Sequence, residues 1–372
     1  MSRRLRHAGA ALLLAVGVLG CSSDKPKPTP LEAYTPRIAG KQVWTASVGS
    51  IEFPLQVAVR GGRFIAAASN GTVVALDADT GATAWRADAG APLTAGVGSD
   101  GRFTSVVTRD NELVTFENAQ VRWRARVPAR VVTPPLVAGE RVFVMGVDRA
   151  VHAYDALDGS KLWTFQRPGD ALTLAQAGLM TVAYNRLLVG QSGRLVALDA
   201  NQGTVAWDLP IGTPRGSNEV ERLADLLGPA VRVGDRVCAR AFQNAVGCAD
   251  VVKGTLLWTR NSAGYSAVGG NADRLFGGDA SDRLTAWNAA NGEVAWTNEK
   301  LLYRGLSGAL AVGPSVVFGD SEGQVHFLAA ADGQLQLRLP TDGKPVVGTP
   351  VLSGTTLLVA TRAGGLFAFR PN

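Results

Sequence analysis

The sequence predicts an all-β protein, an eight-bladed β-propeller that is closed by pairing of its N-terminal and C-terminal strands. Three observations predict this fold: a strand–turn–strand unit that recurs along the chain, a nearly constant spacing between its copies, and one unpaired strand at each end of the array. One propeller blade takes about 40–45 residues. Residues 37–372 are therefore expected to form a single propeller domain.

The recurring unit is clearest between Gly71 and Trp85. Residues 72–76 are β-branched and apolar, which is typical of a strand buried on both faces. Residues 77–81 combine the Asp and the Gly that favour a tight turn, and Trp85 follows on the return strand. Copies with the same spacing are Asp155, Gly159 and Trp163; Asp199, Gly203 and Trp207; Asp250, Gly254 and Trp258; and Asn288, Gly292 and Trp296.

Two further copies depart from the pattern. Leu337 replaces Trp in one of them, and the copy that ends at Trp123 lacks the Gly and has a turn two residues shorter. Regular recurrence of a large apolar ring indicates packing between blades rather than a ligand-stacking site. His152 and His326 occupy the repeat position of Val74, so they are interpreted as strand side chains before catalytic groups.

The spacing of the copies fixes the number of blades. The marker residues lie at positions 44, 85, 123, 163, 207, 258, 296 and 337. The last copy of the strand before the turn, residues 365–369, has no return strand, and the first marker strand, residues 42–45, has no partner before it. Pairing of these two strands closes a ring and removes the exposed edges of a linear array. The sequence therefore predicts eight blades, with seven as the alternative.

The chain begins with a predicted signal peptide, residues 1–20. Three arginines precede an apolar run over residues 8–19, which is too short to span a bilayer. The residues around Cys21 resemble a bacterial lipobox, which predicts lipidation, including palmitate, at Cys21. An ordinary signal peptide with an incidental cysteine is the alternative.

Residues 21–36 are predicted to be the lipidated N-terminus and a flexible tether, because they are rich in Ser, Lys, Pro and Thr. Ser22, rather than Asp, follows Cys21, which resembles the sorting signal for the outer membrane. The expected location is therefore the outer membrane, with the protein anchored by lipid and facing the periplasm.

Charge and motifs exclude several function classes. The formal net charge is +6, and without the three arginines of the signal it is 6 − 3 = +3, too small and too scattered to predict binding of nucleic acid. The sequence has no P-loop, CxxC or HExxH motif. One GxSxG match spans residues 319–323, but a strand rather than a helix follows it, so it does not predict a nucleophile. We expect no enzyme, no cofactor and no metal site.

Cys238 and Cys248 lie at equal distances from Gln243, the centre of a predicted hairpin. Export permits a disulfide between them. Two small buried thiols are the alternative, and the sequence does not decide between these readings.

The longest insertion between markers lies between Trp207 and Trp258 and includes residues 212–225. A long connection in an otherwise economical repeat is a favoured place for function. Charged residues alternate there with Val220 and Leu223, which favours a protein-binding loop over a decorative one.

These features together resemble the outer-membrane protein assembly factor BamB family, whose propellers carry pyrroloquinoline-quinone-type repeats. Residues 216–225 are similar to the family stretch G-S-T-E-I-D-R-L-S-D, and residues 301–304 and 319–323 also resemble family segments. The resemblance implies a non-enzymatic scaffold lipoprotein that binds the POTRA domains of the central barrel subunit and assists outer-membrane proteins, including nascent chains, during folding and insertion.

The resemblance also implies a set of partner-binding residues. Leu172 and Leu174 match a family loop as apolar anchors, but Ala175 stands where the family has Arg. Asp225 matches the first Asp of the second family loop, but Leu227 replaces the second. Charge for the contact is then expected from the neighbours of Asp225, which are Glu221 and Arg222. The alternative for the two leucines is ordinary blade core.

Two other functions remain open from the sequence. Quinone-dependent dehydrogenases share the repeat, but they need a cofactor pocket with a calcium ion held by carboxylates. A periplasmic propeller that binds unfolded chains by adding a strand to a blade edge is the second alternative, and it is compatible with a scaffold role.

Overall fold

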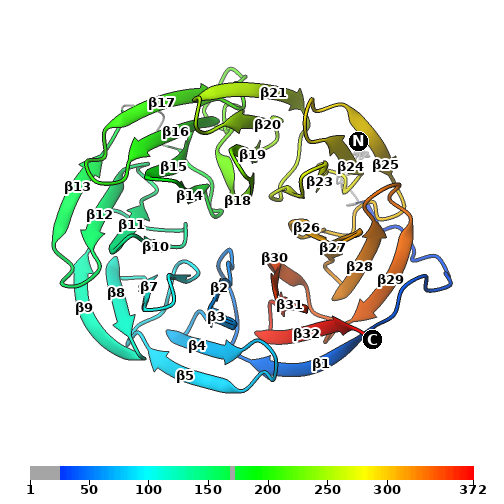
Figure 1. Cartoon of the computed structure of the whole chain (residues 1–372), viewed down its shortest axis with the longest axis horizontal. Helices are drawn as coiled ribbons and strands as arrows, with labels where there is room; N and C mark the ends of the chain where they lie inside the picture. The colour runs from blue at the N-terminus through cyan, green and yellow to red at the C-terminus, as the bar shows by residue number, and fades with distance from the viewer. Residues whose placement is uncertain (1–25, 168–171) are drawn as a thin grey trace, which may run out of the picture.

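The computed structural model of the chain describes residues 26–167 and 172–372. Eight four-stranded antiparallel sheets stand around a central channel like the blades of a fan (Figure 1). The prediction of an all-β, eight-bladed propeller is confirmed. No helix of membrane-spanning length and hydropathy occurs among the described residues.

The blades follow one another in chain order. Within each blade the innermost strand lines the channel, and the other three lie at increasing distance from it. Blade 1 contains β2 (Ala58–Arg60), β3 (Arg63–Ala67), β4 (Thr72–Asp77) and β5 (Thr83–Asp88). Blade 2 contains β6 (Gly98–Ser99), β7 (Phe103–Val107), β8 (Glu112–Glu117) and β9 (Gln120–Arg126). Blade 3 contains β10 (Leu136–Ala138), β11 (Arg141–Met145), β12 (Val151–Asp155) and β13 (Lys161–Phe165). Blade 4 contains β14 (Met180–Ala183), β15 (Arg186–Gln191), β16 (Arg194–Asp199) and β17 (Val205–Pro210).

The second half of the ring repeats this arrangement. Blade 5 contains β18 (Leu226–Val233), β19 (Arg236–Ala241), β20 (Ala245–Asp250) and β21 (Thr255–Asn261). Blade 6 contains β22 (Gly269–Gly270), β23 (Arg274–Gly278), β24 (Leu284–Asn288) and β25 (Val294–Asn298). Blade 7 contains β26 (Leu310–Val312), β27 (Ser315–Gly319), β28 (Gln324–Ala329) and β29 (Leu335–Pro340). Blade 8 contains β30 (Val346–Ser353), β31 (Thr356–Thr361) and β32 (Gly365–Pro371), and its outer strand is β1 (Gly40–Ser47).

Strand β1 closes the ring. It pairs antiparallel with β32 from Gly40, opposite Pro371, to Ser47, opposite Gly365, with a bulge near Trp44. The N-terminal strand thus completes the last blade, as predicted, and both strands gain partners that neither would have in an open array.

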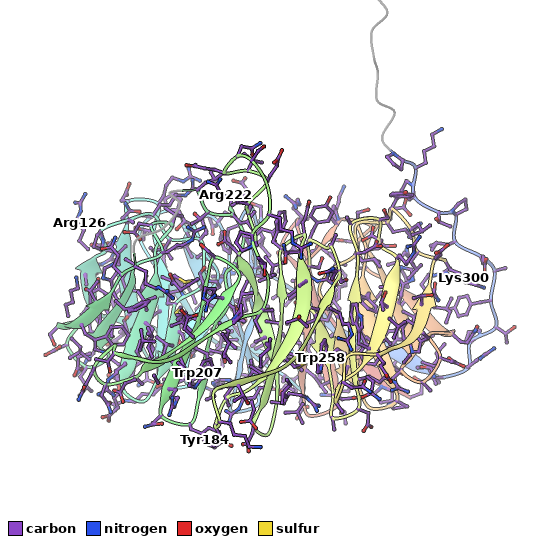
Figure 2. The ribbon with its side chains drawn as sticks, turned by 90° about the horizontal axis from the view of Figure 1, so that it is seen from above. Arg126, Tyr184, Trp207, Arg222, Trp258 and Lys300 are labelled. Carbon is purple, nitrogen blue, oxygen red and sulfur yellow. A yellow bond between two sulfur atoms is a disulfide. The ribbon has the colours of Figure 1, made fainter. Side chains whose placement is uncertain are left out.

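The two faces of the ring carry different connections. Because strands alternate in direction, the turns within the inner and outer hairpins of each blade lie on one face, and the middle turns and the links between blades lie on the other. Figure 2 shows Tyr184, in the inner turn of blade 4, on the first face, and Arg222, in the link to blade 5, on the second. We call these the Tyr184 face and the Arg222 face.

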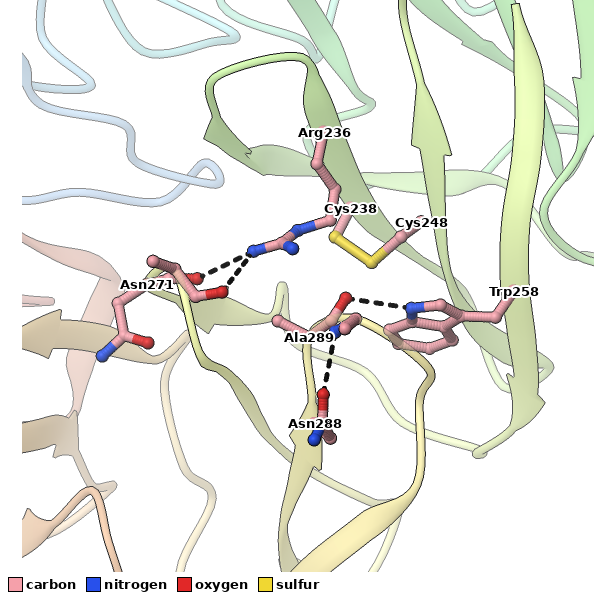
Figure 3. Close-up of a disulfide and its surroundings, with 9 residues drawn as sticks. Arg236, Cys238, Cys248, Trp258, Asn271, Asn288 and Ala289 are labelled. Atoms are coloured by element: carbon pink, nitrogen blue, oxygen red, sulfur yellow. Dashed lines mark hydrogen bonds between the residues drawn. A yellow bond between two sulfur atoms is a disulfide. The ribbon is translucent and has the colours of Figure 1, made fainter.

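Blades are held together by the recurring marker residues. The indole Nε1 of Trp258 donates to the carbonyl of Ala289 in the next blade at 3.0 Å (Figure 3). A Cβ on Gly292 would lie 2.4 Å from this ring, so only glycine fits beneath it. The same bond joins Trp44 to Ala78, Trp123 to Ala156, Trp163 to Ala200 and Trp296 to Ala330. The markers therefore pack blade against blade.

Trp207 departs from this pattern. Its Nε1 is buried and has no hydrogen-bond partner among the described residues. The edge of its ring that meets Gly254 carries Cδ1, whereas the other rings present Cδ2 or Cε3 to their glycines. Val251 occupies the position at which the blades with a Trp–Ala hydrogen bond have Ala. We attribute the different orientation of the Trp207 ring to the extra bulk of the Val251 side chain.

Cys238 and Cys248 are joined by a disulfide of 2.01 Å in the structure. They face each other across β19 and β20, and both are buried beside the strand that carries Trp258 (Figure 3). The intervening turn places Gln243 at a φ of 46°.

The stretch that the sequence predicts to be a tether differs from that expectation where it is described. The amide of Thr29 donates to the carbonyl of Leu302, and the amide of Arg37 donates to the carbonyl of Gln336. In Figure 1 this segment runs outside β29 before it enters β1. Residues 29–37, which we call the strap, are therefore fixed to blade 7 and to the link that leads into it, rather than free.

Candidate functional site

Two links between blades meet on the Arg222 face: residues 172–178, which lead into blade 4, and residues 211–225, which lead into blade 5. Figure 2 labels Arg222 in the second of these links. The isolated bridge between Gly178 and Leu227 joins the ends of these links. The structure thus brings together the two loops that the sequence singles out separately.

Asp225 ties the two loops to blade 3. One carboxylate oxygen accepts from the guanidinium of Arg149 at 3.1 Å, and the other accepts from the amide of Leu174 at 3.1 Å. Arg149 also donates to the carbonyl of Leu172 at 2.8 Å. Both charged side chains are largely buried, at 11% and 16% exposure, so this pair is shielded from solvent. Asp225 therefore positions the Leu172 loop, and its direct contact with a partner stays a prediction.

The second loop is shaped by its own hydrogen bonds. The Asn218 side chain accepts from the amide of Glu221 at 2.9 Å, which caps a single turn. The Glu221 carboxylate accepts from the amide of Ser217 at 2.8 Å, and this bond lowers the pKa of Glu221. A Cβ on Gly216 would lie 2.2 Å from that of Glu221, so the close turn requires glycine. The turn presents Val220, which is 68% exposed.

The predicted residues fall into two groups by exposure. Leu172 is 36% exposed, whereas Leu174 is half-buried and lines a 40 Å³ pocket under the loop. Leu227 is buried at 3%, so a carboxylate at that position would not face solvent. Leu172 and Val220 are thus the apolar side chains that this surface offers to a partner. Cys21, the predicted lipidation site, lies outside the described residues.

The sequence reading missed Arg149 and gave Val220 no separate role. Arg149 lies in the middle turn of blade 3, and 76 positions separate it from Asp225. To place Arg149 beside Asp225 from the sequence, every strand and turn of blades 3 to 5 would have to be aligned correctly. Val220 was visible as an apolar residue among charged ones, and its exposure is the signal that the loop structure adds.

The central channel has a volume of about 960 Å³. Two of its acidic residues serve the fold: Asp282 accepts from the amides of Gly305 and Leu306, and Asp279 accepts from the amide of Ser281. Burial raises the pKa of Asp282. Within residues 26–167 and 172–372, no group of three His, Cys, Asp or Glu side chains could hold a metal ion. These residues do not fit a calcium-dependent quinone site.

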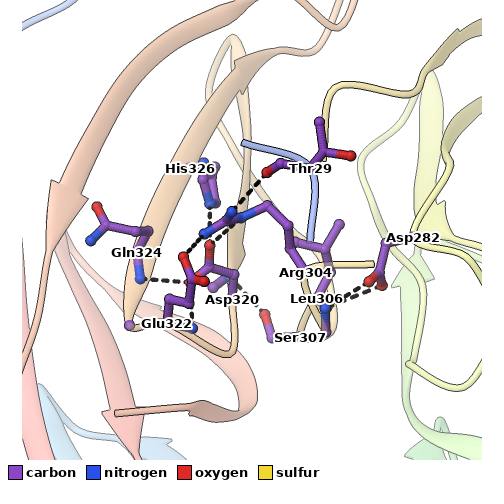
Figure 4. Close-up of polar contacts among 12 residues, drawn as sticks. Thr29, Asp282, Arg304, Leu306, Ser307, Asp320, Glu322, Gln324 and His326 are labelled. Atoms are coloured by element: carbon purple, nitrogen blue, oxygen red, sulfur yellow. Dashed lines mark hydrogen bonds and ion pairs between the residues drawn. The ribbon is translucent and has the colours of Figure 1, made fainter. Parts of the chain in front are cut away.

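The GxSxG turn belongs to a buried ionic network in blade 7 (Figure 4). Asp320 accepts from the Nε of Arg304 at 2.8 Å and from the Nε2 of His326 at 2.9 Å, and all three side chains are buried. Burial disfavours the ionised form of Asp320, but the bonds from His326, the Gln324 amide and Arg304 outweigh it and lower its pKa. His326 thus faces Asp320 rather than Ser321, which argues against a nucleophile here.

This network makes stability depend on pH. Burial lowers the pKa of His326 from its ordinary 6.5 and outweighs the hydrogen bond to Asp320, which acts to raise it. Below pH 6.5 the unfolded chain therefore binds more protons than the folded chain, and the free energy of unfolding falls as the pH falls. His326→Gln keeps an N–H donor and should flatten this dependence between about pH 7 and pH 5, measured by urea unfolding. Parallel curves for the two proteins would contradict this assignment.

Comparison with known proteins agrees with this geometry. Residues 31–93 and 69–298 match the family model described as outer membrane protein assembly factor BamB. The outer membrane protein assembly factor BamB of Burkholderia pseudomallei is 36% identical over 377 residues, which cover 99% of each chain. The chain belongs to the BamB family. The family resemblance inferred from the sequence is confirmed.

Solved structures agree on the fold. BamB from Moraxella catarrhalis superposes with a TM-score of 0.80 at 23% identity, covering 89% of this chain and 99% of that one. The quinohemoprotein alcohol dehydrogenase of Comamonas testosteroni has a TM-score of 0.68 at 15% identity, with coverage of 89% and 76%. That likeness is one of fold alone. Membership in the BamB family, an assembly factor family, supports the prediction that the protein is not an enzyme.

Proposed function

We propose that this protein is a lipid-anchored scaffold subunit of the machinery that assembles β-barrels in the outer membrane. It is anchored through Cys21, faces the periplasm and binds the POTRA domains of the central barrel subunit. The observation that carries this proposal is the pair of loops on the Arg222 face, which are fixed to each other while Leu172 and Val220 remain exposed.

The fixed loops suit a protein contact. Apolar side chains that point into solvent cost free energy unless a partner covers them, and a few such anchors dominate most interfaces. The bonds of Asp225 to Arg149 and Leu174 hold the Leu172 loop before binding, so less conformational entropy is lost in the complex. The contact is therefore apolar at its centre, with Asp225 acting as a positioning residue.

Replacing both Leu172 and Val220 by Asp should reduce co-purification of the central barrel subunit by about tenfold or more, because each lost anchor costs roughly 1–2 kcal/mol of binding. The measurement is a pull-down of the full-length lipidated protein from solubilised outer membranes. Val252→Asp is the matched control: Val252 is 54% exposed, and it lies in an outer turn on the Tyr184 face. Undiminished co-purification by the folded double variant would exclude this surface.

A further inference from the structure

The strap is held along its length by blade 7 and by the link that leads into this blade. At its start, the amide of Thr29 donates to the carbonyl of Leu302, and the carbonyl of Thr29 accepts from Arg304 at 2.9 Å. At its centre, the hydroxyl of Tyr34 accepts from the amide of Arg338 at 2.7 Å, and its ring lies 5.1 Å from the guanidinium carbon of that residue. These bonds fix backbone and side chain together.

The strap also contributes to the core of the blade. Leu31 packs against the apolar cluster that includes Leu301, Leu306 and Phe318. Arg304, which holds the carbonyl of Thr29, is 2% exposed and is itself fixed by Asp320 (Figure 4). A strap that merely lay on the surface would need neither an apolar anchor nor a buried cation. Its attachment is thus built into the blade.

The strap crosses the ring from one face to the other. Leu302 lies in the link between blades 6 and 7, and such links lie on the Arg222 face. Strand β1 starts at Gly40 beside the end of β32, on the Tyr184 face. Figure 2 shows the described start of the chain near the level of Arg222, with the strap descending past Lys300. The chain therefore reaches the propeller on the Arg222 face.

The number of residues between Cys21 and the strap limits how far the propeller can lie from the lipid anchor. From Cys21 to Thr29 there are 29 − 21 = 8 residues, which span at most about 29 Å when fully extended. Without the strap, the first attachment to the propeller would be Gly40, 40 − 21 = 19 residues away, with a reach of about 68 Å. Docking the strap more than halves this reach and moves the attachment point to the opposite face.

We infer that the docked strap turns the Arg222 face, with its Leu172 and Val220 loops, towards the lipid surface and holds it near that surface. This inference rests on the proposed anchor at Cys21. It assigns to the strap the role of positioning the proposed binding loops. A short connection raises the effective concentration of those loops for a partner at the same membrane. The partner surface that the face meets first is then the one nearest the lipid headgroups.

The test compares two dye positions on the full-length lipidated protein. Val220→Cys labels the Arg222 face and Tyr184→Cys labels the Tyr184 face. Both residues are well exposed, and the disulfide leaves no competing thiol among the described residues. Vesicles of phosphatidylethanolamine and phosphatidylglycerol carry acceptor-labelled lipid. We expect stronger energy transfer from position 220 than from position 184.

The strap is then released by Leu31→Ser with Tyr34→Ala, and the difference between the two dye positions should disappear. Release is checked independently by trypsin, which should cut after Arg37 faster than in the parent protein. The control is Glu32→Gln, which removes only the exposed pair with Lys300 and should preserve the difference.

Each remaining outcome overturns the inference. Equal transfer from both positions in the membrane-bound parent protein would overturn it alone. So would a difference that survives in the uncut Leu31→Ser, Tyr34→Ala variant once a separate trypsin digest has shown that its strap is released. Failure of the parent protein to bind vesicles would overturn both the anchor and the inference.

Discussion

Replacing Arg304 by Met should lower the free energy of unfolding by about 3–5 kcal/mol, because it leaves the fully buried carboxylate of Asp320 without its cation. His326 would have to take a proton in a site whose burial opposes it. The same change removes the donor to the carbonyl of Thr29, so the strap should loosen as well. Urea unfolding followed by circular dichroism measures the first effect, and cleavage by trypsin at Arg37 measures the second.

Two further variants show whether burial is the cause. Arg283 pairs with Glu299 on the surface, and the two side chains are 49% and 59% exposed. Arg283→Met should therefore lower the free energy of unfolding by only a small fraction of the loss caused by Arg304→Met. Arg304→Met combined with Asp320→Asn removes both charges and keeps an oxygen for the amides of the turn. This double variant should recover much of the lost stability. Equal costs for Arg304→Met and Arg283→Met would refute the account.

The fold was predictable because its signals are local and repeated. The turn that follows Leu76 shows why: Asp77 accepts from the amide of Thr80 at 2.9 Å, and Gly81 has a φ of 73°, so residue types alone specify the turn. The shorter turn before Trp123 also obeys local rules, since Asn118 and Ala119 both take positive φ in a two-residue hairpin. Counting such units gives the number of blades.

The site was predictable only in part, because its contacts join residues far apart in the chain. The loop around Asp225 could be singled out by its length, but its partner Arg149 belongs to a turn two blades earlier along the chain. The strap shows the same limit more strongly. Its composition is that of a linker, and the cation that holds Thr29 lies 275 positions away. The composition of a segment indicates how flexible it is on its own, but it does not show which residues elsewhere in the chain bind it.

Trp258→Ala should destabilise the propeller by about 3–5 kcal/mol, as expected for removal of a large ring that is only 6% exposed. Part of this cost comes from the bond to the carbonyl of Ala289. Trp258→Phe keeps most of the apolar contact but leaves that carbonyl unpaired, so it should cost about 1–3 kcal/mol. Equilibrium unfolding in guanidinium measures both changes.

Trp207 is the natural control, since its Nε1 makes no hydrogen bond among the described residues. Trp207→Phe should therefore cost less than Trp258→Phe, because it removes a buried donor that has no acceptor. Ala289→Val should place beside Trp258 the same extra bulk that Val251 places beside Trp207. This overpacking should lower the free energy of unfolding by about 1–3 kcal/mol. If the two Phe variants are equally destabilised, the turned ring of Trp207 makes an equivalent bond in solution. In that case, residue size beside the marker does not govern how neighbouring blades lock together.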